Sequence, residues 1–151
     1  MITINKNKKA YFSYEVIEKL LCGIKLLGSE VKSIRASNVS IVEAHCIIKD
    51  KEMYIKGMNV SPFKEAGTHN NHDPLRERKL LLKKKEIINL AEQVSQNGLT
   101  IIPLAILLTK TGFIKVEIGL GKGKKIADKR DSELRKEDKR EMDRAKKIQS
   151  K

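Results

Sequence analysis

The sequence predicts a mainly β fold with flanking helices, closed into a small antiparallel barrel and followed by a basic C-terminal tail. Three observations carry this prediction. Most apolar residues fall into short runs separated by turn residues, which is typical of strands. Two further segments repeat their apolar residues at helical spacing. After Gly121 the composition changes to charged residues with few apolar side chains.

Five segments are expected to be strands: residues 11–27, 43–49, 53–60, 99–109 and 113–120. The first is long, with a bend at Gly23. The second and third form a hairpin about Asp50 and Lys51, which ends before Pro62. Pro103 places an edge or a bulge in the fourth. Short strands in a twisted antiparallel sheet fit a barrel of the oligonucleotide-binding (OB) type, and an open α+β sandwich is the alternative.

Two helices are expected, at 28–35 and 84–97. In the first, Ser29 is a good N-cap and Glu30 suits the first turn. The second has an apolar face and stops at Gly98. Between the expected strand 53–60 and the expected helix 84–97 lies a polar loop, residues 63–79, which leads into a basic run at 76–85.

The chain is expected to divide into three parts. Residues 1–10 are a basic N-terminal arm that is mobile at its start, and 11–121 are the barrel. Residues 122–151 hold 13 Lys plus Arg, 7 Asp plus Glu and only a thin apolar stripe. Such a tail has little to bury, so we expect it to be disordered or helical and to fold on a partner.

The charge balance predicts an anionic partner. The chain has 32 Lys plus Arg against 19 Asp plus Glu, a formal net charge of +13 in 151 residues. Self-repulsion on this scale opposes folding, so it favours a function that uses the charge, with RNA, DNA and acidic membranes as candidates. A merely solubilising surface rarely needs such an excess. Aromatic residues are 4% of the chain, which favours recognition of a folded RNA by shape and phosphate over base stacking.

Other functions find little support in the sequence. The apolar runs are too short for a membrane span or a signal peptide, so we expect a cytoplasmic protein. Cys22 and Cys46 lack CxxC spacing and are expected to be reduced. His69 and His72 have no further ligands nearby, so no metal is expected. The glycine-rich segment 119–125 lacks the spacing of a phosphate-binding loop. No nucleophile and base stand out, so we expect neither catalysis nor a cofactor.

Four blocks together resemble the small protein B family, the bacterial tmRNA-binding (SsrA-binding) proteins. They are residues 28–35 (GSEVKSIR), 72–82 (HDPLRERKLLL), 98–104 (GLT, then PL) and 115–130 (KVE through GKGKK to DKR). They occur in family order over nearly the entire chain. The resemblance implies an OB-type barrel that binds the tRNA-like domain of tmRNA and delivers it, as a monomer in the complex, to stalled ribosomes. It also implies a tail that enters the empty messenger channel and performs no chemistry.

The predicted contact residues come from the charge pattern and from the resemblance together. For tmRNA they are Asn7, Lys8, Lys9, Lys32, Arg35, Arg76, Arg78, Lys79, Leu81 and Lys115. For the ribosomal decoding centre they are Gly123, Lys124, Lys125, Asp128, Lys129 and Arg130. Leu21 stands where the family usually has a carboxylate, and Ala127 where it usually has His or Tyr. Two rival hypotheses are a ribosomal or ribosome-assembly protein and a small nucleic-acid enzyme.

Overall fold

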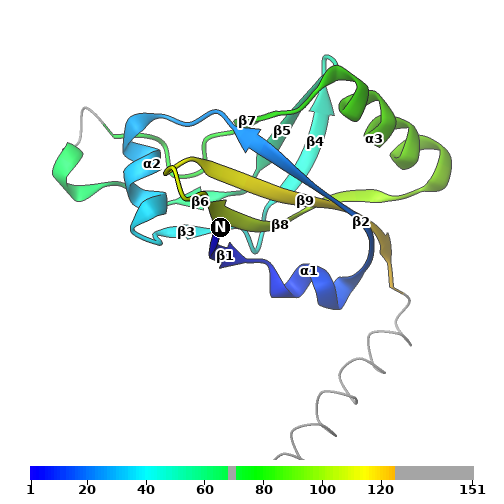
Figure 1. The fold of residues 1–151 in the computed structure, drawn as a ribbon, viewed down its shortest axis with the longest axis horizontal. Helices are drawn as coiled ribbons and strands as arrows, with labels where there is room; N and C mark the ends of the chain where they lie inside the picture. Colours follow the sequence, from blue (N-terminus) through cyan, green and yellow to red (C-terminus); the bar gives the residue numbers. More distant parts are fainter. Residues whose placement is uncertain (68–70, 125–151) are drawn as a thin grey trace, which may run out of the picture.

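A computed structural model describes residues 1–67 and 71–124 of the chain. Seven strands form one antiparallel sheet in the order β1-β8-β9-β2-β7-β5-β4, and β3 pairs with β6 in a second, small sheet (Figure 1). The elements are β1 (Ile2–Lys6), α1 (Lys8–Ser13), β2 (Tyr14–Ile24), α2 (Gly28–Arg35), β3 (Val39–Ser40), β4 (His45–Lys49), β5 (Glu52–Lys56), β6 (Asn59–Val60), η1 (Lys64–Ala66), β7 (Arg78–Leu81), α3 (Lys84–Asn97), β8 (Thr100–Leu108) and β9 (Ile114–Gly123).

The mainly β fold with flanking helices is confirmed, and the predicted closure is not. In the described part of the chain, the hydrogen-bonded sheet has two ends, β1 and β4. Strand β4 nevertheless contacts β8. The sheet is therefore strongly curved but is not a continuous ring of paired strands.

The N-terminal segment differs most from its prediction. Ile2–Lys6 was expected to be part of a mobile arm, but it is strand β1 and pairs with β8. Ile4 packs against the core, and the Asn7 N–H donates to the Leu104 carbonyl at 2.8 Å. Because both the backbone and an apolar side chain are engaged, this segment belongs to the folded body.

Strand β2 is the long strand expected at 11–27, but it begins only at Tyr14, because residues 11–13 belong to helix α1, which was not predicted. It connects the two halves of the sheet. It pairs with β9 from Tyr14 to Gly23 and with β7 at Gly23 and Ile24. A Cβ atom on Gly23 would lie 3.2 Å from the Leu81 Cβ. Glycine therefore permits the close approach of β7 at the point where β2 changes partners.

The predicted hairpin forms, but its second strand is shorter than expected. Asp50 and Lys51 both have positive φ (50° and 63°), as a tight turn requires. Strand β5 stops before Gly57, whose φ is 76° and where a Cβ would lie 2.6 Å from the Glu43 carbonyl oxygen. The chain turns there, and Asn59–Val60 joins the second sheet. Part of the expected polar loop and basic run is instead strand β7, in which Arg78 and Leu80 are buried and Leu81 is exposed.

Apolar side chains pack on both faces of the sheet. The main core includes Ile55, Leu80, Val116 and Leu90 of α3. A smaller cluster of Ala10, Ile102 and Leu104 lies between α1 and β8. The Pro103 bulge is confirmed by the register shift between Pro103 and Ala105, since β8 lies inside the sheet between β1 and β9.

Both predicted helices have the expected bounds, with one correction at a cap. Helix α3 ends at Gly98, which has the left-handed conformation expected of a C-terminal stop. Helix α2 begins after Leu27, whose N–H donates to the Glu30 carboxylate at 2.7 Å. Ser29 lies inside the helix and is not its N-cap; its hydroxyl bonds to the His72 ring at 2.8 Å.

Candidate nucleic-acid interface

Three predicted contact residues, Lys79, Leu81 and Lys115, line one open groove of about 550 Å³. Lys79 and Leu81 lie on β7 and Lys115 lies on β9, and the pairing of both strands with β2 brings them together. Gly23 of β2 pairs with Leu81 on one side and with Lys115 on the other. The Lys79 ammonium also forms an ion pair with Glu52 at 3.3 Å. Gly23 lines the groove and has no side chain to fill the space between its two partners.

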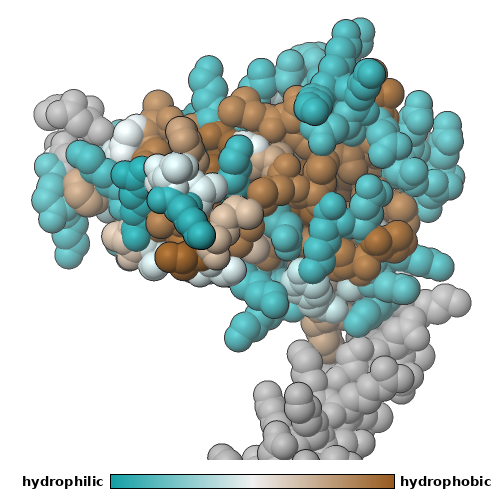
Figure 2. All heavy atoms as spheres, in the orientation of Figure 1, coloured by the Kyte–Doolittle hydropathy of each residue, from teal (hydrophilic) through white to brown (hydrophobic). Residues whose placement is uncertain are grey.

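The groove combines exposed apolar side chains with positive charge. Leu81 is 50% exposed and Leu21, also in the groove, is 41% exposed. Figure 2 shows apolar residues gathered in the middle of the face where β2 and β9 lie, with hydrophilic side chains around them. Apolar surface can pack against sugars and bases, and ammonium groups attract phosphates. The sequence prediction omitted Leu21 and Lys83 from this set, although Lys83 belongs to the basic run that was recognised.

Arg78 was predicted to contact RNA, but it is fully buried. Its guanidinium forms an ion pair with the buried Glu30 carboxylate and donates to the Met58 carbonyl at 2.8 Å. Arg76, one-third exposed, donates to the same carboxylate at 2.6 Å. Arg78 therefore holds α2 against β7 and has no exposed atom that could bind a phosphate. Arg76 binds Glu30 and is also partly exposed to solvent.

The charges of this buried cluster stabilise one another. Burial tends to raise the pKa of Glu30, but hydrogen bonds from Arg76, from the Leu27 N–H and from Arg78 outweigh it, so the pKa lies below its usual value. Burial lowers the pKa of Arg78, and the hydrogen bond and charge of Glu30 oppose this shift. A guanidinium remains protonated under all ordinary conditions, so the cluster stays ionised at neutral pH.

Asn7 is also a buried residue and not an exposed contact. Its side-chain oxygen accepts from the Ala10 N–H at 3.2 Å, which caps α1, and its amide donates to the Pro103 carbonyl at 3.0 Å. With 4% exposure it positions α1 on β8. The neighbouring Lys8 is exposed, as a phosphate contact requires.

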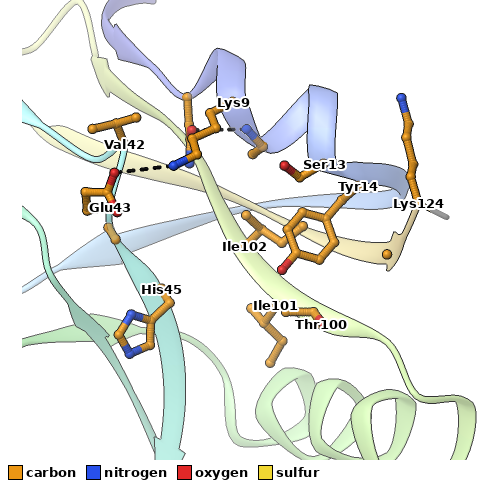
Figure 3. A pocket seen from close by; sticks show the side chains of 14 residues that line it. Lys9, Ser13, Tyr14, Val42, Glu43, His45, Thr100, Ile101, Ile102 and Lys124 are labelled. Carbon is orange, nitrogen blue, oxygen red and sulfur yellow. Dashed lines mark hydrogen bonds and ion pairs between the residues drawn. The ribbon is translucent and has the colours of Figure 1, made fainter. Parts of the chain in front are cut away.

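A second cavity, of about 390 Å³, joins the N-terminal segment to the start of the tail. Figure 3 shows Lys9 and Lys124 on its rim, with the Tyr14 ring and Ile102 between them. Lys9 forms an exposed ion pair with Glu43 at 3.5 Å. Gly123 and Asn7 also line the cavity, so two residues predicted for the tail lie beside two predicted for tmRNA. Lys125, Asp128, Lys129 and Arg130 lie outside the described residues.

Lys32 and Arg35 lie on α2 and do not line the groove. Both are exposed. The Lys32 ammonium lies 5.4 Å from the centre of the Phe63 ring, and Arg35 donates to the Gly112 carbonyl at 2.7 Å. These two cations therefore form a separate basic surface, as their spacing on one helix face predicted.

His72, one half of the HxxH pair, is buried and bonds through its other ring nitrogen to the Val60 carbonyl at 2.8 Å. Within residues 1–67 and 71–124, no three His, Cys, Asp or Glu side chains are grouped as metal ligands would be. In the same part of the chain, no helix has the length and apolar character needed to cross a bilayer.

The curved sheet and its basic, partly apolar groove define a small nucleic-acid-binding protein. A model of the family described as SmpB protein matches residues 4–148. This chain belongs to that family.

Individual relatives agree with this assignment. The SsrA-binding protein of Synechococcus elongatus is 44% identical over 142 residues, covering 94% of this chain and 92% of the relative. That of Prochlorococcus marinus strain MIT 9515 is 50% identical over 137 residues, covering 91% and 82%. That of Cytophaga hutchinsonii is 49% identical over 139 residues, covering 92% and 90%.

The fold has a solved counterpart. A chain in the structure "tmRNA-SmpB: a journey to the center of the bacterial ribosome" superposes with a TM-score of 0.66. The two are 41% identical, and the match covers 80% of this chain and 84% of the other. The likeness therefore extends over most of the folded body.

Proposed function

We propose that this protein binds the tRNA-like domain of tmRNA and delivers that RNA to stalled ribosomes in trans-translation. The observation that carries the proposal is the meeting of Lys79, Leu81 and Lys115 in one groove, in a chain that matches the SmpB family over residues 4–148. The relatives are named SsrA-binding proteins, and the solved counterpart is named with tmRNA and the bacterial ribosome. The role is binding in the cytoplasm, without catalysis.

In this proposal the folded body and the C-terminal tail have different roles. The folded body presents a rigid basic surface to a structured RNA, and its sheet acts as an OB-type barrel in which contact between β4 and β8 takes the place of pairing. Strand β9 runs to Gly123, beyond the predicted start of the tail at residue 122, and residues 125–151 supply a further 11 basic side chains. In this proposal they enter the empty messenger channel near the decoding centre, and one copy of the protein acts in each complex.

The groove is tested by Lys115→Gln and Leu81→Ala, each in the full chain. Removing one phosphate contact should lower the slope of log affinity against log salt by about 0.7–0.9. Removing the exposed Leu81 side chain should weaken binding to the tRNA-like RNA without changing that slope, because no charge is lost. Lys110→Gln, at the exposed β8–β9 turn, is the matched control. Affinities equal to wild type for both groove variants would exclude this groove as the interface.

The tail is tested by stopping the chain after Lys124. This point is chosen because β9 runs to Gly123 and the Lys124 N–H donates to the Ser13 carbonyl at 3.0 Å, so an earlier stop would damage the body. The shortened protein should bind tmRNA as the whole chain does but fail to support peptide tagging on stalled ribosomes. Equal tagging by both would remove the tail from the mechanism. Sequencing the RNA that copurifies with the whole chain identifies the partner independently.

A further inference from the structure

Three lysines converge on Tyr11 in α1: Lys6 and Lys19, which are near it in the sequence, and Lys124, which is far from it. The Lys6 ammonium, at the end of β1, lies 5.2 Å from the centre of the Tyr11 ring. The Lys19 ammonium, on β2, lies 5.3 Å from the same centre. The Lys124 ammonium donates to the Tyr11 carbonyl at 3.2 Å. We call Tyr11, Lys6 and Lys19 the tyrosine platform.

The platform lies on the same side of β2 as the groove. Lys19 and Leu21 are two residues apart on one strand, so their side chains share a face. Leu21 lines the groove, and the β9 partners of these two residues are Gly119 and Glu117. The platform is therefore a lateral extension of the groove toward Lys124, where the tail begins.

The two lysine charges of the platform are not neutralised by ion pairs within the described part of the chain. Lys6 and Lys19 take part in none of the ion pairs found among the described residues. A hydrogen bond with Tyr11 is the main cause of a raised pKa for Lys19, with smaller contributions from the charges of Tyr11 and Glu117. Both ammonium groups lie within 5.3 Å of one ring centre, so each would attract a phosphate that approaches this ring.

We propose that the tyrosine platform binds a backbone phosphate of the RNA, extending the groove interface along β2 toward the base of the tail. This inference rests on the proposed function and deepens it, because Lys6, Tyr11 and Lys19 are not among the predicted contact residues. The Tyr11 ring holds the two lysines in place, and their ammonium groups bind the phosphate.

The test compares two doubly substituted full-length chains that have lost the same charge. Lys6→Gln with Lys19→Gln removes the platform, and Lys56→Gln with Lys110→Gln removes two exposed lysines elsewhere. Affinity for the folded tRNA-like RNA is measured from 0.15 to 1 M salt. Loss of one phosphate contact should lower the log–log slope by about 0.8, which corresponds to about fivefold weaker binding at 0.15 M salt. The control should change the slope by less than about 0.2.

A merely structural role for the platform gives a different result. If the lysines only fasten α1 to the sheet, the platform variant should melt at a lower temperature but keep the wild-type salt slope. That result, or equal slopes for platform variant and control, would overturn the inference. If the wild-type chain itself binds tRNA-like RNA no better than single-stranded poly(U), the proposed function fails and not the platform alone.

Discussion

Replacement of Glu30 by Gln should cause a large loss of stability, because it leaves a buried cation without its counter-charge. Glu30 and Arg78 are both fully buried, and the carboxylate also accepts from Arg76 at 2.6 Å and from the Leu27 N–H at 2.7 Å. Removing one partner of a buried pair typically costs about 3–5 kcal/mol. The amide oxygen still accepts a hydrogen bond, so we expect about 3 kcal/mol in the free energy of unfolding.

Urea unfolding at pH 7 measures this loss, and Glu43→Gln is the control. Glu43 pairs with Lys9 at 3.5 Å, but both side chains are largely exposed, so its replacement should cost at most about 0.5 kcal/mol. A loss below about 1 kcal/mol for Glu30→Gln would show that water or rearrangement compensates Arg78, which would refute the account of the buried cluster.

The same carboxylate predicts a pH dependence. The pKa of Glu30 in the folded protein is lowered, so its ionised form contributes stability that is complete above the unfolded value of about 4.3. That contribution is lost as the pH falls through the lower, folded pKa. Wild-type protein should therefore lose more stability than Glu30→Gln when the pH is lowered below about 4. Parallel losses in both proteins would contradict this sign.

Three further results are expected. Asn7→Ala should cost about 2 kcal/mol of stability in thermal unfolding, because it removes the α1 cap and a buried hydrogen bond to Pro103; an unchanged melting temperature would contradict this structural role. Gly119→Ala should cost about 1–3 kcal/mol, since its Cβ would lie 2.7 Å from Leu104 Cδ1; no loss would mean that Leu104 moves freely. Burial raises the pKa of Cys22 to about 12, so with Cys46→Ser it should react with a thiol reagent at pH 8 only as the protein opens, and rapid labelling would disprove its burial.

Charge runs in the sequence did not separate structural cations from binding cations. Arg76, Arg78 and Lys79 lie in one basic segment. Arg78 is buried, Arg76 binds Glu30 and is partly exposed, and Lys79 lines the groove. The alternation of side chains along β7 separates Arg78 from Lys79, and that strand was not predicted because its charges hid the apolar pattern. The buried Glu30 on α2 was read only as a first-turn residue, since its partners are far away in the sequence.

The sequence alone determined the properties that depend on local pattern and on composition. These are the bounds of α2 and α3, the hairpin turn at Asp50 and Lys51, an edge or a bulge at Pro103 and the need for an anionic partner at a net charge of +13. The ordered blocks also indicated the family that the comparisons established.

Tertiary structure decided which side chains meet. The pairing of β2 with both β7 and β9 at Gly23 makes the groove, and the pairing of β1 with β8 turns an apparent arm into part of the body. Neither follows from local spacing, because each joins segments that are dozens of residues apart and depends on strand register. Burial of Arg78 beside Glu30 is settled in the same way, since a charge can be internal only where the fold supplies its partner.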